Sequence, residues 1–195
     1  MGTATQNTVF YEGVGGHRDI PPFPTRRSSD LLQPGDVLVL LGETRGELGA
    51  SMYLREILGR EDGAPPKVDL ARERRTGDFV RDMIEGEQIA VVHDLSDGGL
   101  IAAVAEMALA SGVGVTLELQ GVLPPQAELF GEDQARYLVA AADADPLLAA
   151  AKAAGIPARR VGVAGGACLA VANLFELPLD QLKDAYEGWM PAYMG

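Results

Sequence analysis

Short apolar runs alternate along this chain with longer segments of helical spacing, and this alternation limits the fold more than any other feature. The run at 37–41 is continuously apolar and lies between Pro34-Gly35 and Gly42, which is typical of a strand buried on both faces. Residues 89–92 form a second run of this kind. Buried strands followed by helices predict an α/β protein, or an α+β protein in two layers, with helices covering the sheet.

The other elements are predicted in the same way, from the spacing of apolar residues and from the Gly and Pro residues between the segments. Apolar spacing predicts helices over 47–58, 69–85, 98–110, 146–154 and 179–188, and strands over 113–119, 136–141, 160–163 and 168–171. Gly59, Gly112 and Gly155 are expected to end three of these helices. We expect the last two strands to pair with each other across residues 164–166.

Charge and composition exclude several classes of function. The chain of 195 residues has a formal net charge of -12, so nucleic acid is not an expected partner, and basic residues gather only at Arg72, Arg74 and Arg75. No run reaches the roughly 18 to 20 apolar residues that a membrane span needs, so we expect no membrane contact. A single cysteine, Cys168, fits the cytoplasm. With two histidines and one cysteine, any metal would be held by carboxylates.

The first 32 residues differ in composition from the rest. They are rich in Gly, Pro, Arg and Ser and contain one strand-like run, residues 8–11. We interpret residues 1–32 as a remnant of a preceding domain and residues 33–195 as the main domain. Residues 24–31 resemble the translated remnant of a sequencing adapter, and a polar loop is the alternative.

The first candidate site is Val92-His-Asp-Leu-Ser-Asp-Gly-Gly-Leu100, between a predicted strand and a predicted helix. Free amides at a helix start bind phosphate, and paired glycines let a ligand approach them. Asp94 and Asp97 would repel a bare phosphate, so the pattern indicates a phosphate bridged by Mg²⁺. In the alternative, Ser96 or Asp97 caps the helix while Gly98 and Gly99 allow tight packing.

Two further segments are weaker candidates. The first, Leu41-Gly-Glu-Thr-Arg-Gly-Glu-Leu-Gly-Ala-Ser51, is a Gly-rich turn after a strand but not a Walker A loop. Its alternative is a helix capped by Thr44. The second, Leu129-Phe-Gly-Glu-Asp-Gln-Ala-Arg-Tyr137, offers two carboxylates and an amide to a cation or a sugar, and its alternative is a solvated turn. No nucleophile and base are placed for covalent catalysis.

Taken in order, these segments resemble the carboxyl-terminal half of the phosphoribosylformylglycinamidine synthase family, within the aminoimidazole ribonucleotide (AIR) synthetase superfamily. The resemblance runs from about Pro34 to the end and includes Arg160-Val-Gly-Val-Ala-Gly-Gly166 and Glu187-Gly-Trp-Met-Pro-Ala-Tyr193. It implies an AIR synthase-related C-terminal domain. It also implies the ATP-dependent conversion of formylglycinamide ribonucleotide to its amidine with ammonia from a glutaminase.

The resemblance also implies ligands and partners. Expected ligands are ATP or ADP, Mg²⁺ and a ribonucleotide, and expected partners are N-terminal domains of the same enzyme, a glutaminase subunit and a small accessory subunit. The family's main catalytic histidines have no counterpart here, so no catalytic residue is assigned and the chain is expected to be an inactive fragment when alone. The residues expected to bind cofactor are Glu43, Thr44, Gly46, His93, Asp94, Ser96, Asp97, Gly98, Gly99, Glu132, Asp133 and Gln134, and those expected to bind metal are Asn7, Asp94 and Asp97.

Two other functions stay open. One is a non-catalytic docking domain that completes a pseudo-dimer. The other is a superfamily cousin such as AIR synthetase or selenophosphate synthetase, which Phe130-Gly-Glu-Asp-Gln134 and Trp189-Met-Pro-Ala-Tyr193 argue against.

Overall fold

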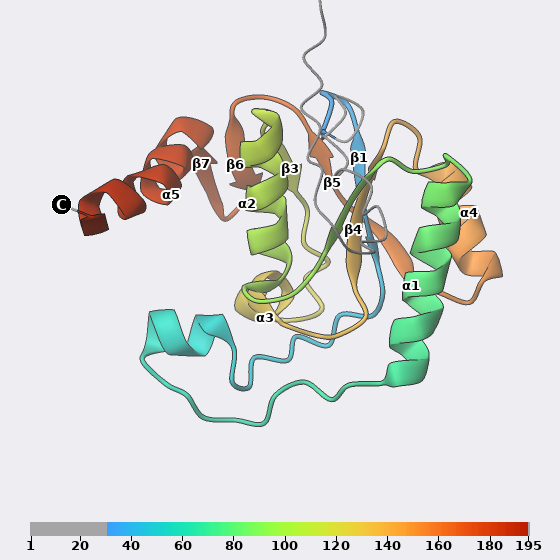
Figure 1. The fold of residues 1–195 in the computed structure, drawn as a ribbon, viewed down its shortest axis with the longest axis horizontal. Helices are drawn as coiled ribbons and strands as arrows, with labels where there is room; N and C mark the ends of the chain where they lie inside the picture. The colour runs from blue at the N-terminus through green and yellow to red at the C-terminus, as the bar shows by residue number, and fades with distance from the viewer. Residues whose placement is uncertain (1–30, 195) are drawn as a thin grey trace, which may run out of the picture.

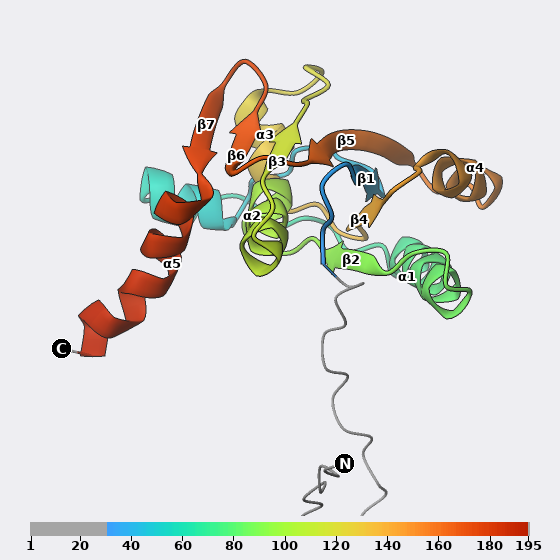
Figure 2. The same cartoon turned by 90° about the horizontal axis from the view of Figure 1, so that it is seen from above.

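The computed structural model describes residues 31–194, which form one mixed sheet with helices on both of its faces. Figure 2 looks nearly along the strands and shows α1 and α4 on one side and α2 on the other. The strands are β1 (Val37–Leu41), β2 (Val91–Asp94), β3 (Val115–Leu117), β4 (Tyr137–Ala141), β5 (Ala158–Ala164), β6 (Cys168–Val171) and β7 (Phe175–Pro178). The α-helices are α1 (Leu70–Glu85), α2 (Gly99–Ser111), α3 (Pro125–Phe130), α4 (Asp145–Ala153) and α5 (Leu179–Met194), and a short π-helix spans Tyr53–Ile57.

The strand order is β2-β4-β1-β5-β3-β6-β7. All neighbouring strands are antiparallel except β3 and β6, which run parallel. In the registers that matter for the site, Leu41 and Asp94 both lie beside Tyr137. The carboxyl ends of β1 and β2 therefore meet at the start of β4. In Figure 1 the labelled strands β1 and β4 lead to this edge on the lower side.

Strand β1 separates two hydrophobic cores. Leu38 and Leu40 belong to the core that α2 covers, and Val39 and Leu41 belong to the core that α1 and α4 cover. All four side chains are fully buried, which confirms the prediction of a strand buried on both faces. The α/β class is confirmed too.

The predicted helix over 47–58 is largely wrong. Only Tyr53–Ile57 is helical, and Ala50 has a positive φ of 54° that breaks any regular helix before it. The backbone of this segment bonds elsewhere, because the Glu47 N–H donates to the Asp133 carboxylate and the Met52 N–H donates to the Glu132 carboxylate. The segment is held by tertiary contacts that its own periodicity does not reveal.

The predicted pairing of 160–163 with 168–171 is also wrong, because β3 lies between β5 and β6. The connection 164–167 passes over the residue before β3, where Gly114 donates its N–H to Gly166 O at 2.9 Å and accepts from Gly165 N–H at 2.7 Å. A side chain at Gly114 would collide with the Cys168 backbone. This glycine therefore allows the close approach that separates the two strands.

The remaining predicted elements are present, with ends shifted by a few residues, and α3 and β7 are additional to them. Gly112 ends α2 in the left-handed conformation and donates to Ala108 O at 2.8 Å, as expected of a terminating glycine. In the part of the chain that the structure describes, no helix has the length and apolarity to cross a membrane.

Candidate functional site

The turn 131–136 is the centre of the polar network at this edge of the sheet. Among the described residues Arg136 is the largest fully buried side chain, and its guanidinium donates to the carbonyl groups of Asp133 and Gly131. Its Nη1 also lies 3.7 Å from the Asp133 carboxylate, in a buried ion pair. Burial lowers the pKa of Arg136, and the charge of Asp133 opposes this shift. The turn is therefore folded around an internal cation.

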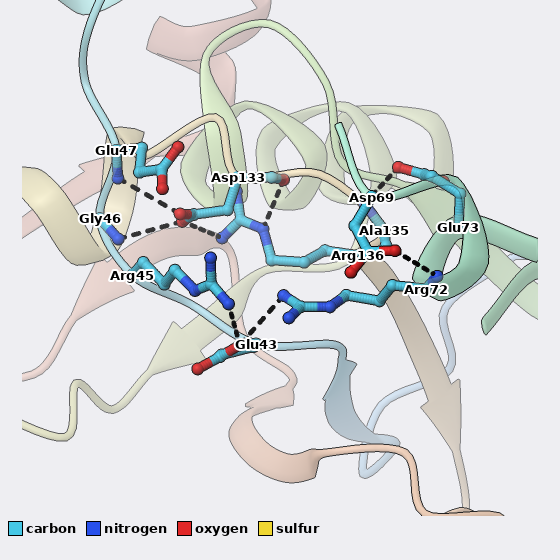
Figure 3. A network of polar contacts seen from close by, with 10 residues as sticks. All are labelled: Glu43, Arg45, Gly46, Glu47, Asp69, Arg72, Glu73, Asp133, Ala135 and Arg136. Carbon is cyan, nitrogen blue, oxygen red and sulfur yellow. Dashed lines mark hydrogen bonds and ion pairs between the residues drawn. The ribbon is translucent and has the colours of Figure 1, made fainter. Parts of the chain in front are cut away.

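Asp133 connects this turn to the loop after β1. Its carboxylate accepts from the N–H of Gly46 at 3.1 Å and from the N–H of Glu47 at 3.3 Å, as Figure 3 shows. In return, the Glu132 N–H donates to Glu47 O at 2.9 Å. Asp133 is 5% exposed, and its oxygens serve the protein's own backbone.

Glu132 connects the same turn to the start of α2. Its Oε1 accepts from the N–H of Met52 and from the N–H of Gly98, both at 2.9 Å. The Gly99 N–H donates to Ser96 O at 3.1 Å. Both glycine amides of this corner are therefore occupied within the protein, and a carboxylate fills the place that the sequence suggested for phosphate.

A second group of charges lies on the outer side of the network. Glu43 Oε2 is 2.9 Å from Arg45 Nη2 and 3.0 Å from Arg72 Nη1, so two arginines share one carboxylate oxygen (Figure 3). The hydrogen bond from Arg45 lowers the pKa of Glu43, and Arg72 adds to this shift. All three side chains are one third to one half exposed, so solvent reaches them.

Two clefts open at this edge and share Gln134 and Ala135. The first, which we call the arginine cleft, has a volume of about 550 Å³ and is lined by Glu43, Arg45, Glu47, Lys67, Val68, Asp69, Leu70, Arg72, Asp133, Gln134 and Ala135. The second, which we call the aspartate cleft, has a volume of about 420 Å³ and is lined by Ala50, Pro65, Pro66, Glu73, Asp94, Leu95, Ser96, Asp97, Glu132, Gln134, Ala135, Arg136 and Tyr137. Both volumes are in the range of small-molecule sites.

The structure brings most of the expected ligand residues to these clefts. Asp94, Ser96, Asp97, Glu132 and Gln134 line the aspartate cleft, and Glu43, Asp133 and Gln134 line the arginine cleft. Thr44 Oγ1 is 3.4 Å from Arg136 Nη1, and Gly46 is bound to Asp133 as described.

Three expected ligand residues lie apart. The His93 ring is 2.9 Å from the Glu106 carboxylate of α2 and lines a different cavity. Gly98 lines an apolar groove, although its N–H binds Glu132. Gly99 is buried so tightly that an added Cβ would lie 2.5 Å from Gly131 O. Asn7 is outside the described residues.

The capping alternatives are wrong, and the packing alternative is confirmed. Helix α2 begins at Gly99, and its N-cap residue is Gly98 with no side-chain cap, so neither Ser96 nor Asp97 caps it. No helix begins at Thr44. The tight packing of Gly99 against the end of α3 is the part of that interpretation that the structure supports.

Within residues 31–194, no group of three or more His, Cys, Asp or Glu side chains is placed to hold a metal. Mg²⁺ commonly takes one or two protein carboxylates and completes its shell with water and phosphate. Asp94 and Asp97, in one cleft, fit that kind of site and not an all-protein cage.

Sequence reasoning missed several residues of the site. Lys67, Asp69 and Arg72 reach the arginine cleft from the segment before α1 and from its first turn, and Glu73 accepts from the Ala135 N–H at 2.6 Å. The basic cluster at 72–75 was the available signal, but only the fold shows which of its members faces the site. Glu128 and Arg159, a largely buried ion pair at 3.0 Å, gave no signal in the sequence.

A family model described as "AIR synthase related protein, C-terminal domain" matches residues 33–171. The chain belongs to this family. It is 57% identical over 96% of its length to the phosphoribosylformylglycinamidine synthase subunit PurL of Caulobacter vibrioides, and 50% identical over 96% to the PurL subunit of Methylocella silvestris. It spans about 27% of the length of these relatives. The family resemblance found in the sequence is confirmed.

Solved structures share the fold. Thermotoga maritima PurL complexed with FGAR matches 79% of this chain with a TM-score of 0.66 and 22% identity, and the chain covers 29% of that protein. Escherichia coli HypE, a hydrogenase maturation protein, matches 80% of this chain with a TM-score of 0.53 and 23% identity. The fold thus occurs in proteins of different function, so the function must be argued from the site.

Proposed function

We propose that this chain is a C-terminal part of an ATP-dependent ligase that converts formylglycinamide ribonucleotide to formylglycinamidine ribonucleotide in purine biosynthesis. The 57% identity to a PurL subunit over 96% of the chain carries this proposal. PurL structures of Thermotoga maritima complexed with ATP and with ADP share the fold and support nucleotide as a ligand of the assembled enzyme. The cytoplasm is the proposed compartment.

In this proposal the chain supplies one wall of a ligand site and works with other parts of the enzyme. Asp94 and Asp97 would hold Mg²⁺, which supplies neutralisation of phosphate charge when bound. A Thermotoga structure called PurLQS shares the fold and supports further subunits as partners, for which we propose a glutaminase and a small accessory subunit. The division at residue 32 and the metal-binding role of Asn7 stay predictions.

Reconstitution tests this function. The chain is mixed with the portion of the Caulobacter relative that it does not match, together with ATP, ammonia and the ribonucleotide substrate. We expect amidine formation in the mixture and none from either component. Amidine formed by this chain alone would refute its inactivity, and a mixture without activity, with both components folded, would count against the ligase assignment.

A non-catalytic docking domain is the second candidate, and one observation favours it. Glu132 occupies the Gly98 amide at the start of α2, so the expected phosphate position is already filled. Calorimetric titration with Mg-ADP separates the two candidates. Binding that is lost in Asp97→Asn supports the nucleotide site, whereas no heat and no thermal shift in the wild type support docking.

A further inference from the structure

The arginine cleft holds cations from two separate segments of the chain. Arg45 comes from the loop after β1, and Arg72 comes from the first turn of α1. Lys67 lines the same cleft from the segment before α1. Figure 3 shows the Arg45 and Arg72 side chains approaching Glu43 from two sides.

One oxygen of Glu43 accepts from both guanidinium groups, at 2.9 and 3.0 Å. Guanidinium groups bind carboxylate and phosphate oxygens with the same fork of N–H donors. The Glu43 carboxylate therefore marks a position where two cations converge on an anionic oxygen, and its lowered pKa keeps it ionised.

We propose that Arg45 and Arg72 form a binding seat for the phosphate monoester of a ribonucleotide, and that Glu43 fills this seat as an internal anion until the ligand displaces it. The proposal rests on the proposed function, since that function brings a ribonucleotide to this edge of the sheet. It assigns to the three residues a chemistry that the family match alone does not give.

Displacing Glu43 from the two arginines requires little free energy. Its side chain is 46% exposed, and those of Arg45 and Arg72 are 48% and 33% exposed. Ion pairs this accessible to water change an equilibrium by no more than about fivefold. A phosphate monoester offers three acceptor oxygens and more charge than one carboxylate, so it engages both arginines more fully.

The dimensions of the cleft favour a small phosphate ester over a polymer. Its volume of about 550 Å³ suits a ribose phosphate or a nucleotide. The chain's net charge of -12 repels an extended phosphate backbone. One phosphate would meet the three cations of the cleft and also its carboxylates, of which Glu43 is the one displaced while Asp69 and Asp133 accept from backbone amides. Binding should also weaken with added salt, because the seat is open to solvent.

The test is a ³¹P NMR titration of the full chain with ribose 5-phosphate, with ADP as a parallel probe. Arg72→Met should weaken ribose 5-phosphate binding about tenfold, because it removes a charged donor pair and keeps the aliphatic stem. Glu43→Gln should tighten binding about two- to fivefold, because it removes the competing charge. The matched control is Arg74→Met, since Arg74 lies on the same helix, is 85% exposed and does not line the cleft.

Each outcome bears on the proposal. The proposal would be overturned if Arg72→Met bound ribose 5-phosphate with wild-type affinity, or if Glu43→Gln bound it more weakly than the wild type. It would also be overturned if the variants changed the affinity for ADP but not that for ribose 5-phosphate. The proposal would also be overturned if no binding were detected at about 20 mM ribose 5-phosphate, because even an ordinary weak site has a Kd in the mM range. Those results would leave the reconstitution of ligase activity untouched, so the two proposals fail separately. The replaced side chains are one third exposed or more, and thermal unfolding confirms that each variant is folded.

Discussion

The Glu132 carboxylate accepts the Gly98 N–H at 2.9 Å, so a side chain of the protein itself stabilises the start of α2. The same oxygen accepts from Met52, and this joins the π-helix segment to α2. A helix start with free amides attracts an anion, and here the chain provides it. The corner is thus structurally complete without a ligand at its two glycine amides.

Replacing Glu132 should therefore destabilise this edge of the sheet. Glu132→Ala leaves two backbone donors without their partner, and we expect a loss of about 1–3 kcal/mol in the free energy of unfolding. Urea unfolding measures the loss, and faster hydrogen exchange at Met52 and Gly98 locates it. Glu132→Gln keeps an acceptor and should lose less. Equal losses in the two variants would show that packing, and not hydrogen bonding, is responsible.

Glu128 and Arg159 should behave as one buried unit. Glu128 is 2% exposed and accepts from both Arg159 and the Gln120 N–H, while Glu128 Oε2 and Arg159 Nη1 have no hydrogen-bond partner among the described residues. Glu128→Ala leaves a largely buried cation unpaired and should cost about 3–5 kcal/mol in urea unfolding.

The double variant Glu128→Met with Arg159→Met checks the cause of that loss. It removes both charges and keeps apolar volume, so most of the lost stability should return. If the double variant is as unstable as the sum of the single ones, the two residues act independently and the interpretation as a pair is wrong.

The sheet and its main helices could be predicted because their signals are local. A few neighbouring residues suffice to predict the apolar strand β1, the Ala-rich helix α2 and the end of that helix at Gly112. The layers and the strand order were harder to predict, because they depend on which faces of the helices and strands pack together. The close approach at Gly114, for example, separates β5 from β6 and leaves no periodic pattern.

The candidate site could be predicted as a set of segments but not as a set of roles. Asp133 and Glu132 have the composition of cation ligands, yet the fold uses both to hold backbone amides 34 to 87 residues away. Arg72 lay in a cluster of basic residues, and only the position of α1 beside the β1 loop brings it to Glu43. Long-range hydrogen bonding decides these roles, and a single sequence does not encode it visibly.

Gly99 and Gly112 offer a matched test of packing at the start of α2. Both have φ of +66°, so alanine at either position carries the same backbone strain of roughly 1–2 kcal/mol. An added Cβ at Gly112 meets nothing within 4 Å, whereas at Gly99 it meets Gly131 O at 2.5 Å and Leu129 O at 2.9 Å. Gly99→Ala should therefore cost a further ~1–3 kcal/mol beyond Gly112→Ala in urea unfolding. Similar losses would contradict the close packing of α2 against the end of α3.

Tyr137 should make stability depend on pH in the alkaline range. Burial raises the pKa of its phenol, and the charges of Glu73 and Asp94 raise it further. The folded protein therefore keeps this proton at a pH where the unfolded chain, with an ordinary pKa near 10, releases it. Because the folded state then binds more protons, the free energy of unfolding should decrease as the pH rises from the unfolded pKa towards the folded one, and below pH 9 the phenol should have no effect. Urea unfolding between pH 8 and 11 measures the slope, and Tyr137→Phe should reduce it. A slope unchanged in this variant would mean that other groups, and not the Tyr137 phenol, control alkaline unfolding.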